Sequence, residues 1–118
     1  MANHNLTGKK GEALALEFLQ GKAFVLLHTN WRYSHYEIDI IAERDEVLHF
    51  VEVKTRRTLR YGYPEESVTD KKMEHLMRAA EAFLQSNPHW ERVQYDILSI
   101  YLNGNEAPEY FFIEDAYL

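Results

Sequence analysis

Two strongly apolar runs of sequence, joined by a short polar segment, constrain the fold of this chain more than any other feature. The runs cover residues 36–42 and 47–54, and the Glu-Arg-Asp-Glu segment 43–46 separates them. Val, Ile and Phe, which favour strands, dominate both runs, and a polar pair within the segment suits the tip of a tight turn. The pattern predicts two neighbouring antiparallel strands.

Four charged side chains interrupt the apolar pattern of these two strands. Successive side chains of a strand point to opposite faces, so Glu52 and Lys54 share one face of the second strand. Glu37 and Asp39 share one face of the first strand for the same reason. If the turn has a two-residue tip at Arg44-Asp45, Glu37 lies opposite Glu52, and Asp39 is its diagonal neighbour. A one-residue change in the loop would place the two pairs on opposite faces.

Strand interiors disfavour Asp, Glu and Lys, so these charges need a partner. A divalent metal ion with a bound water is one such partner. The alternative is a hairpin with one solvated face, on which Glu and Lys pair across the strands. Because both runs are apolar around their charges, as in strands that are covered on both faces, the sequence favours the metal-site hypothesis.

The same residues resemble a known pattern. An Asp, then a hairpin, then Glu-x-Lys is the signature of the PD-(D/E)XK nuclease fold, which restriction enzymes and archaeal Holliday-junction resolvases share. The chain is most similar to the YraN-like family of small uncharacterised bacterial proteins. The blocks that carry this resemblance are Gly11-Glu12, Asn30-Trp31-Arg32, Glu37-Ile38-Asp39-Ile40-Ile41, Phe50-Val51-Glu52-Val53-Lys54-Thr55-Arg56, Val68-Thr69-Asp70-Lys71-Lys72 and Tyr95-Asp96-Ile97-Leu98. Tyr36 stands where the family usually has a glycine.

The resemblance implies an α/β protein with a restriction-endonuclease-like mixed sheet flanked by helices, in the core order α-β-β-β-α-β. At 118 residues, the chain is expected to form a single domain over residues 1–118. Helices are predicted at about 6–20 and 69–85, and further strands at 24–30, 93–102 and 110–113. The second helix has an apolar stripe that predicts its core-facing side, namely Met73, Leu76, Met77, Ala80, Phe83 and Leu84.

The resemblance also implies the residues of an active site. Asp39 and Glu52 would bind Mg²⁺ or Mn²⁺, with the carbonyl of Val53 as a third oxygen ligand. Hard cations of this kind take carboxylates, carbonyls and waters. Lys54 would position the attacking water or stabilise the charge that develops on the phosphate.

Two further acids, Glu12 and Glu37, would complete or orient this site. Glu12 lies on or beside the apolar stripe of the first helix, where a carboxylate is rarely left unpaired. The alternative for Glu12 is a favourable interaction with the helix dipole, or an ion pair with Arg32.

A basic segment directly after the predicted site suggests a nucleic-acid contact. Residues 54–60 hold four bases, among them Arg56, Arg57 and Arg60, and the aromatic loop Tyr61-Gly62-Tyr63-Pro64 follows. Basic and aromatic side chains together suit a phosphate backbone and stacked bases. Lys72, in the first turn of the second helix, is a further candidate phosphate contact, although it also fits an ordinary exposed lysine. The segment equally fits a solvated loop.

Composition excludes several other kinds of site. The chain has no cysteine, so disulfides, thiolate metal sites and thiol nucleophiles are ruled out. Its six histidines show no His-x-x-x-His spacing, which argues against a zinc site, and His49 reads as a packed strand residue. No phosphate-binding glycine loop or nucleophile elbow occurs. No apolar run approaches ~18 residues, so we expect no membrane contact and a cytoplasmic location.

The sequence leaves three functional hypotheses open. The first is a nuclease that acts on DNA in preference to RNA, and a homodimer would present two such sites to a branched substrate. The second is a non-catalytic nucleic-acid-binding or assembly module, which the net charge of −6 favours. The third is a structural partner that docks through the acidic segment 87–118. The joint presence of Asp39, Glu52 and Lys54 favours the nuclease.

Overall fold

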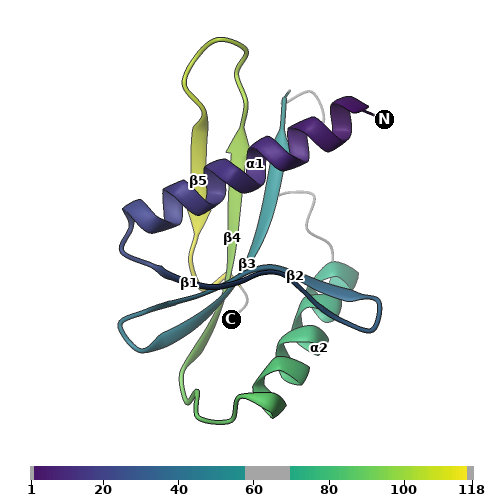
Figure 1. Ribbon diagram of the computed structural model, residues 1–118, viewed down its shortest axis with the longest axis vertical. Helices are drawn as coiled ribbons and strands as arrows, with labels where there is room; N and C mark the ends of the chain where they lie inside the picture. Colours follow the sequence, from purple (N-terminus) through teal and green to yellow (C-terminus); the bar gives the residue numbers. More distant parts are fainter. Residues whose placement is uncertain (1, 58–69, 117–118) are drawn as a thin grey trace.

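The computed structural model describes residues 2–57 and 70–116. Within these ranges the chain forms two helices and five strands, and the predicted order α-β-β-β-α-β with one further strand is confirmed (Figure 1). The elements are α1 (Ala2–Gly21), β1 (Val25–Tyr33), β2 (Tyr36–Arg44), β3 (Val47–Arg56), α2 (Asp70–Ser86), β4 (Val93–Tyr101) and β5 (Glu109–Ile113). Neither helix in these ranges combines the length and apolar character needed to cross a membrane.

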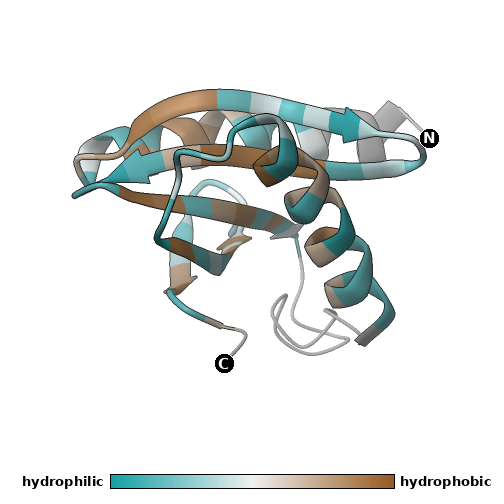
Figure 2. Cartoon of the chain, turned by 90° about the horizontal axis from the view of Figure 1, so that it is seen from below, coloured by the Kyte–Doolittle hydropathy of each residue, from teal (hydrophilic) through white to brown (hydrophobic). Residues whose placement is uncertain are grey.

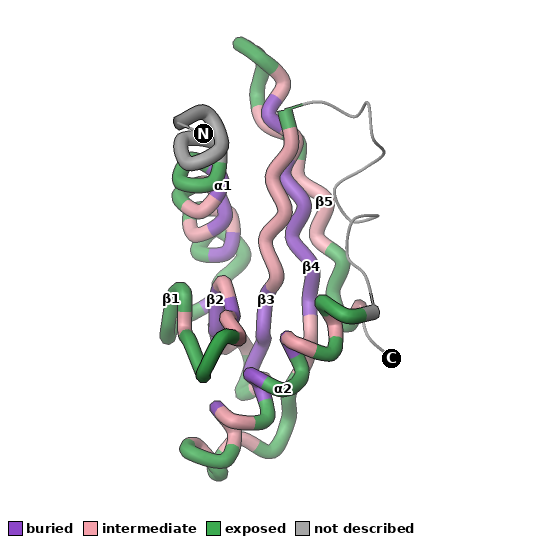
Figure 3. Tube along the Cα trace, turned by 90° about the vertical axis from the view of Figure 1, so that its right-hand side faces the viewer, coloured by how far each residue is buried: buried purple, intermediate pink, exposed green. Residues whose placement is uncertain are grey.

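All five strands form one mixed sheet with the order β1-β2-β3-β4-β5. The pair β3 and β4 is parallel, and the other neighbouring pairs are antiparallel. Parallel neighbours need a crossover connection, and α2 lies in the connection between β3 and β4. The two helices pack against opposite faces of the sheet (Figure 3). This α/β arrangement is the one expected for a restriction-endonuclease-like fold.

A separate hydrophobic core lies on each face of the sheet, and the central strands contribute to both (Figure 2). Under α1, Ala15 and Leu19 are fully buried. Under α2, the buried helix residues are Leu76, Ala79, Ala80 and Phe83. The predicted stripe of α2 was wrong for Met77, whose exposed fraction is 45%. Met77 instead lines a groove on the outer side of α2.

The β2–β3 hairpin has a different register from the one predicted. Arg44 pairs with Val47, so the tip is Asp45-Glu46 and not Arg44-Asp45. Both tip residues have positive φ, 54° and 65°, as a type I′ turn requires. Moving the tip by one position shifts the register by two residues, and a two-residue shift preserves which side chains share a face.

This register changes which acidic residues of the two strands lie opposite each other. The cross-strand pairs end at Ile40 and Val51, and one further step of the same register places Asp39 opposite Glu52. The predicted opposition of Glu37 and Glu52 was therefore wrong. Asp39, and not Glu37, is the residue that the hairpin directs toward Glu52.

Candidate active site where strands β2 and β3 part

The carboxylate of Asp39 lies where the ladder between β2 and β3 ends. Its Oδ2 accepts a hydrogen bond from the backbone N–H of Val53 at 2.8 Å. Beyond Ile40 and Val51 the two strands no longer pair, so this N–H needs another acceptor. The Asp39 side chain supplies it, and this bond fixes the carboxylate between the two strands.

The surroundings of Asp39 disfavour the ionised form of its carboxyl group. The pKa of Asp39 is raised to about 7, first by burial and then by the neighbouring charges of Glu52 and Glu37. The Val53 hydrogen bond and the charge of Lys54 lower the pKa but do not offset these effects. A pKa this high means that no nearby positive charge fully compensates the ionised Asp39 carboxylate. Such a group marks a place where a cation would be stabilised.

Glu52 and Lys54 project from β3 toward the α2 side of the sheet. They alternate with Val51 and Val53, which pack in the core on the α1 side. The Nζ atom of Lys54 lies 3.4 Å from Oε1 of Glu52, and both side chains are about one-fifth exposed, 18% and 20%. Lys54 is therefore accessible from solution while its amino group is held beside the acid.

Lys72 approaches the same group from the first turn of α2. Its pKa is lowered, first by a hydrogen-bonding contact with the Lys54 side chain and then by burial and by the charge of Lys54. The charge of Glu52 acts in the opposite direction. The structure thus brings Lys72 of α2 to Lys54 and Glu52 of β3.

Glu12 reaches the opposite side of Asp39. A cavity of about 70 Å³ under α1 is lined by both of these carboxyl residues, together with Leu16, Thr29, Asn30 and Ile40. The preceding residue, Gly11, explains how α1 comes so close. A Cβ atom on Gly11 would lie 2.0 Å from Oγ1 of Thr55 on β3, so only glycine permits this approach.

Glu37 lies at the edge of the site and has its own partner. Its carboxylate is 3.4 Å from the guanidinium of Arg32, the residue that the sequence suggested as a partner for Glu12. Glu37 nevertheless acts on the pKa of Asp39. Among the residues described, no three of the four acids (Glu12, Glu37, Asp39 and Glu52) bring carboxylate oxygens within 4.8 Å of one another. The acids surround Asp39 but do not form a closed cage.

The predicted nucleic-acid contacts are described only in part. Arg56 ends β3, where its carbonyl accepts a hydrogen bond from the backbone of Leu102 at 2.7 Å. Arg57 follows directly and is exposed. Arg60 and the aromatic loop 61–64 lie outside the described residues.

The structure also adds residues to which the sequence assigned no role at the site. Thr29 and Asn30 line the cavity beside Asp39, and Asn30 has a positive φ of 51°. The only signal for Asn30 was its place in the Asn-Trp-Arg block. On the same chain, His49 and Asp96 form a buried pair, with 2.6 Å between Nδ1 and Oδ2. No local spacing links these two residues.

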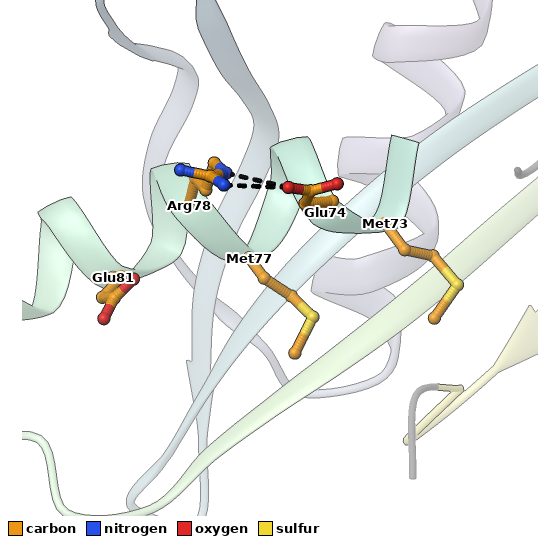
Figure 4. A pocket seen from close by; sticks show the side chains of 5 residues that line it. All are labelled: Met73, Glu74, Met77, Arg78 and Glu81. Atoms are coloured by element: carbon orange, nitrogen blue, oxygen red, sulfur yellow. Dashed lines mark hydrogen bonds and ion pairs between the residues drawn. The ribbon is translucent and has the colours of Figure 1, made fainter. Parts of the chain in front are cut away.

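A shallow groove along the outer side of α2 is a separate feature. Met73 and Met77 project to the same side of the helix, and Arg78 bonds Glu74 one turn away, at 2.9 and 3.2 Å (Figure 4). Glu81 completes the lining. Of the residues that line the groove, only Arg78 lowers the pKa of Glu74, through their hydrogen bond and opposite charges. This is an ordinary surface ion pair.

Comparison with known sequences defines the family. The profile of a family described as "Uncharacterised protein family UPF0102" matches residues 11–100. The chain belongs to this family. It is 41% identical to a UPF0102 protein of Flavobacterium psychrophilum, an alignment that covers 99% of this chain and 98% of the relative. It is 40% identical to one from Chloroherpeton thalassium, over 93% and 92% of the two chains. A UPF0102 protein of Caldicellulosiruptor saccharolyticus is 39% identical, over 98% and 99%.

The UPF0102 match spans the elements that build the site. Residues 11–100 run from Gly11 and Glu12 through the β2–β3 hairpin and α2 to β4. The predicted kinship with the YraN-like group of uncharacterised proteins is confirmed. The names of these UPF0102 relatives state no reaction.

Proposed function

We propose that this UPF0102 protein is a metal-dependent nuclease that hydrolyses phosphodiester bonds of nucleic acid, with DNA preferred over RNA. One observation carries the proposal. Asp39, with its pKa raised to about 7, is fixed where the strands part, and Glu52 and Lys54 act on it electrostatically. A carboxylate pair with a lysine beside it suits a cation and the charge of a phosphate.

The donor atoms at this place fit Mg²⁺ or Mn²⁺. Asp39 and Glu52 offer carboxylate oxygens, and the Val53 carbonyl is the proposed third ligand. Such an oxygen-only set suits hard divalent cations, which keep several waters when bound. The raised pKa of Asp39 supports this fit. A bound cation would stabilise the ionised carboxylate, which burial and the neighbouring acids disfavour. When bound, the ion would polarise the phosphate and lower the pKa of a bound water.

The side chains of the site have distinct roles in this proposal. Lys54, held at 3.4 Å from Glu52, keeps a positive charge beside the phosphate and stabilises the charge that develops there. Lys72, in contact with Lys54, adds a second cation on the α2 side. Glu12 and Glu37 orient Asp39 or its surroundings from either side. Arg56, Arg57 and Arg60 would contact the nucleic-acid backbone.

Two substitutions test the proposal. Lys54→Ala and Glu52→Gln each remove a charge and no core volume, so both proteins should fold. We expect Mg²⁺-dependent cleavage to fall on the order of 10²-fold or more in each, as when preorganised electrostatic stabilisation is lost. Nucleic-acid binding should fall much less, because the arginines remain. Lys22→Ala and Glu91→Gln, at exposed positions outside the site, are matched controls that should keep full activity.

A second candidate is a nucleic-acid-binding or assembly module that has this fold without turnover. The net charge of −6 favours it, because an acidic surface slows the association with a polyanionic substrate that turnover needs. Duplex, single-stranded, branched and RNA substrates with Mg²⁺ or Mn²⁺ separate the two. Binding of any of them without cleavage of any would refute the nuclease and support the module.

A further inference from the structure

A second cluster of potential ligand atoms lies at the end of the sheet near the C-terminal end of α1. His49 on β3, Asp96 on β4 and Glu114 just after β5 each offer one nitrogen or oxygen atom, and these atoms all lie within 4.8 Å of one another. His49 and Asp96 are buried, with exposed fractions of 2% and 0%, whereas Glu114 is exposed. Two of the three potential ligands are therefore shielded from solvent, and the third is open to it.

Asp96 is held in a fixed orientation by its neighbours. Its Oδ1 accepts hydrogen bonds from Nε2 of Gln94 at 3.0 Å and from the backbone N–H of Asp115 at 2.9 Å. Its Oδ2 faces Nδ1 of His49 at 2.6 Å. One carboxylate oxygen is therefore bonded to two protein donors, and the other is hydrogen-bonded to the imidazole.

Glu114 is placed beside this pair by Arg44. The guanidinium of Arg44 bonds Oε1 of Glu114 and lies over the ring of Phe24, 4.2 Å from its centroid. Phe24 also packs edge-on against the ring of His49, with 4.8 Å between centroids. Because Arg44 bonds one oxygen of Glu114, the second oxygen remains available to a ligand.

With His49 neutral, the cluster carries more negative than positive charge. Two carboxylates, Asp96 and Glu114, face one guanidinium, Arg44. A buried carboxylate is stable only when it is paired or bound to a metal. The hydrogen bond with His49 meets this need, and it joins two atoms that are both typical metal ligands.

We propose that His49, Asp96 and Glu114 bind a divalent transition-metal ion of the Zn²⁺ class. One imidazole nitrogen and two carboxylate oxygens are ligands typical of Zn²⁺ and Co²⁺, and water would take the remaining position. The ion would take the place of the hydrogen bond between His49 and Asp96. Mg²⁺ prefers oxygen-only sites and should not compete there. The ion would connect β3, β4 and the segment after β5.

Titration with Zn²⁺ alone, followed by NMR of the histidine ring nitrogens, tests this site directly. We expect the His49 resonances to shift at a stoichiometry of one ion, with tight binding that Glu114→Gln weakens at least tenfold. Glu109→Gln, at an exposed acid at the other end of β5, is the matched control and should leave the affinity unchanged. If Glu114→Gln perturbs folding, Glu114→Asp keeps the charge, shortens the reach and should also weaken binding.

Two rival sites must be separated in the same experiment. His35 and His75 lie with their ring centroids 6.0 Å apart, which allows adventitious Zn²⁺ binding, and His75→Asn removes it. Asp39→Asn removes the candidate Mg²⁺ site. Zn²⁺ binding that is lost in either of these variants, or that leaves the His49 resonances unchanged, would overturn the proposal. Binding that survives both and depends on Glu114 supports it.

Discussion

The carboxylate of Asp39 on β2 accepts a hydrogen bond from the backbone N–H of Val53 on β3, 2.8 Å away, at the point where the two strands stop pairing. The bond takes the place of the next rung of the ladder. It also fixes the acid between Glu52 on one side and the Glu12 cavity on the other. A single side chain thus both closes the end of a strand pair and provides the centre of the candidate site.

The raised pKa of Asp39 predicts an unusual dependence of stability on pH. In the unfolded chain this carboxyl has a pKa near 3.9, whereas folding raises it to about 7, so the folded state binds the proton more tightly. Its contribution to stability is therefore fully present at low pH and is lost as pH rises to about 7. From about pH 5 to pH 8 we expect the unfolding free energy to fall by roughly 2–3 kcal/mol in the wild type, relative to Asp39→Asn. Urea unfolding across this range measures it, and equal slopes in the two proteins would contradict the prediction.

Metal binding should depend on the same carboxyl. Isothermal calorimetry should detect Mg²⁺ or Mn²⁺ in the wild type and at least tenfold weaker binding in Asp39→Asn, because one anionic ligand is lost. The affinity should rise between about pH 6 and pH 8 as the proton leaves Asp39. Asp45→Asn, in the exposed turn of the same hairpin, is the control. Unchanged affinity in Asp39→Asn would place the ion elsewhere.

Two glycines in α1 should respond in opposite ways to the same substitution. Gly11→Ala places a Cβ atom against Thr55 and should lower the unfolding free energy by about 1–3 kcal/mol, because neither the helix nor the strand has room to adjust. Gly8→Ala has open space and should raise it by about 0.5–1 kcal/mol through helix propensity. Thermal unfolding of both variants gives the comparison. Equal effects would mean that α1 does not depend on this close approach.

The basic end of β3 should govern the salt dependence of nucleic-acid binding. Arg56→Ala with Arg57→Ala should weaken binding and reduce the slope of log affinity against log salt by up to about 2. Lys22→Ala with Arg92→Ala removes the same charge from exposed positions outside the basic segment and should leave the slope nearly unchanged. Fluorescence anisotropy between 50 and 200 mM salt measures both. Equal losses of slope would show that binding depends only on net charge.

Sequence reasoning found the elements because hydrophobic periodicity is a local property. It missed the register of the β2–β3 hairpin because Glu43-Arg44-Asp45-Glu46 contains no glycine or asparagine to mark the tip. The structure uses Asp45 and Glu46 at positive φ, a conformation that aspartate tolerates but that glutamate rarely adopts. The error moved the tip by one position. Because the register changed by an even number of residues, the prediction of which side chains share a face was unaffected.

The candidate site was predictable in its residue types but not in its electrostatics. The Asp-hairpin-Glu-x-Lys pattern identified Asp39, Glu52 and Lys54, and their roles remain a prediction. The pKa of Asp39 depends on burial and on the end of a ladder, which a sequence does not show. The pairing of His49 with Asp96 depends on the parallel contact of β3 and β4, which brings together segments with no common local motif.

The unequal lengths of the connections between strands have a consequence for how the chain folds. Two-residue turns join β1 to β2 and β2 to β3, whereas all of α2 and its flanking segments separate β3 from β4. Short loops close quickly and at small entropic cost, and distant pairs form late. The β1–β3 meander should therefore assemble first and bring Asp39 to Val53 while β4 and β5 are still undocked. Substitutions in β5 should then change the unfolding rate more than the folding rate.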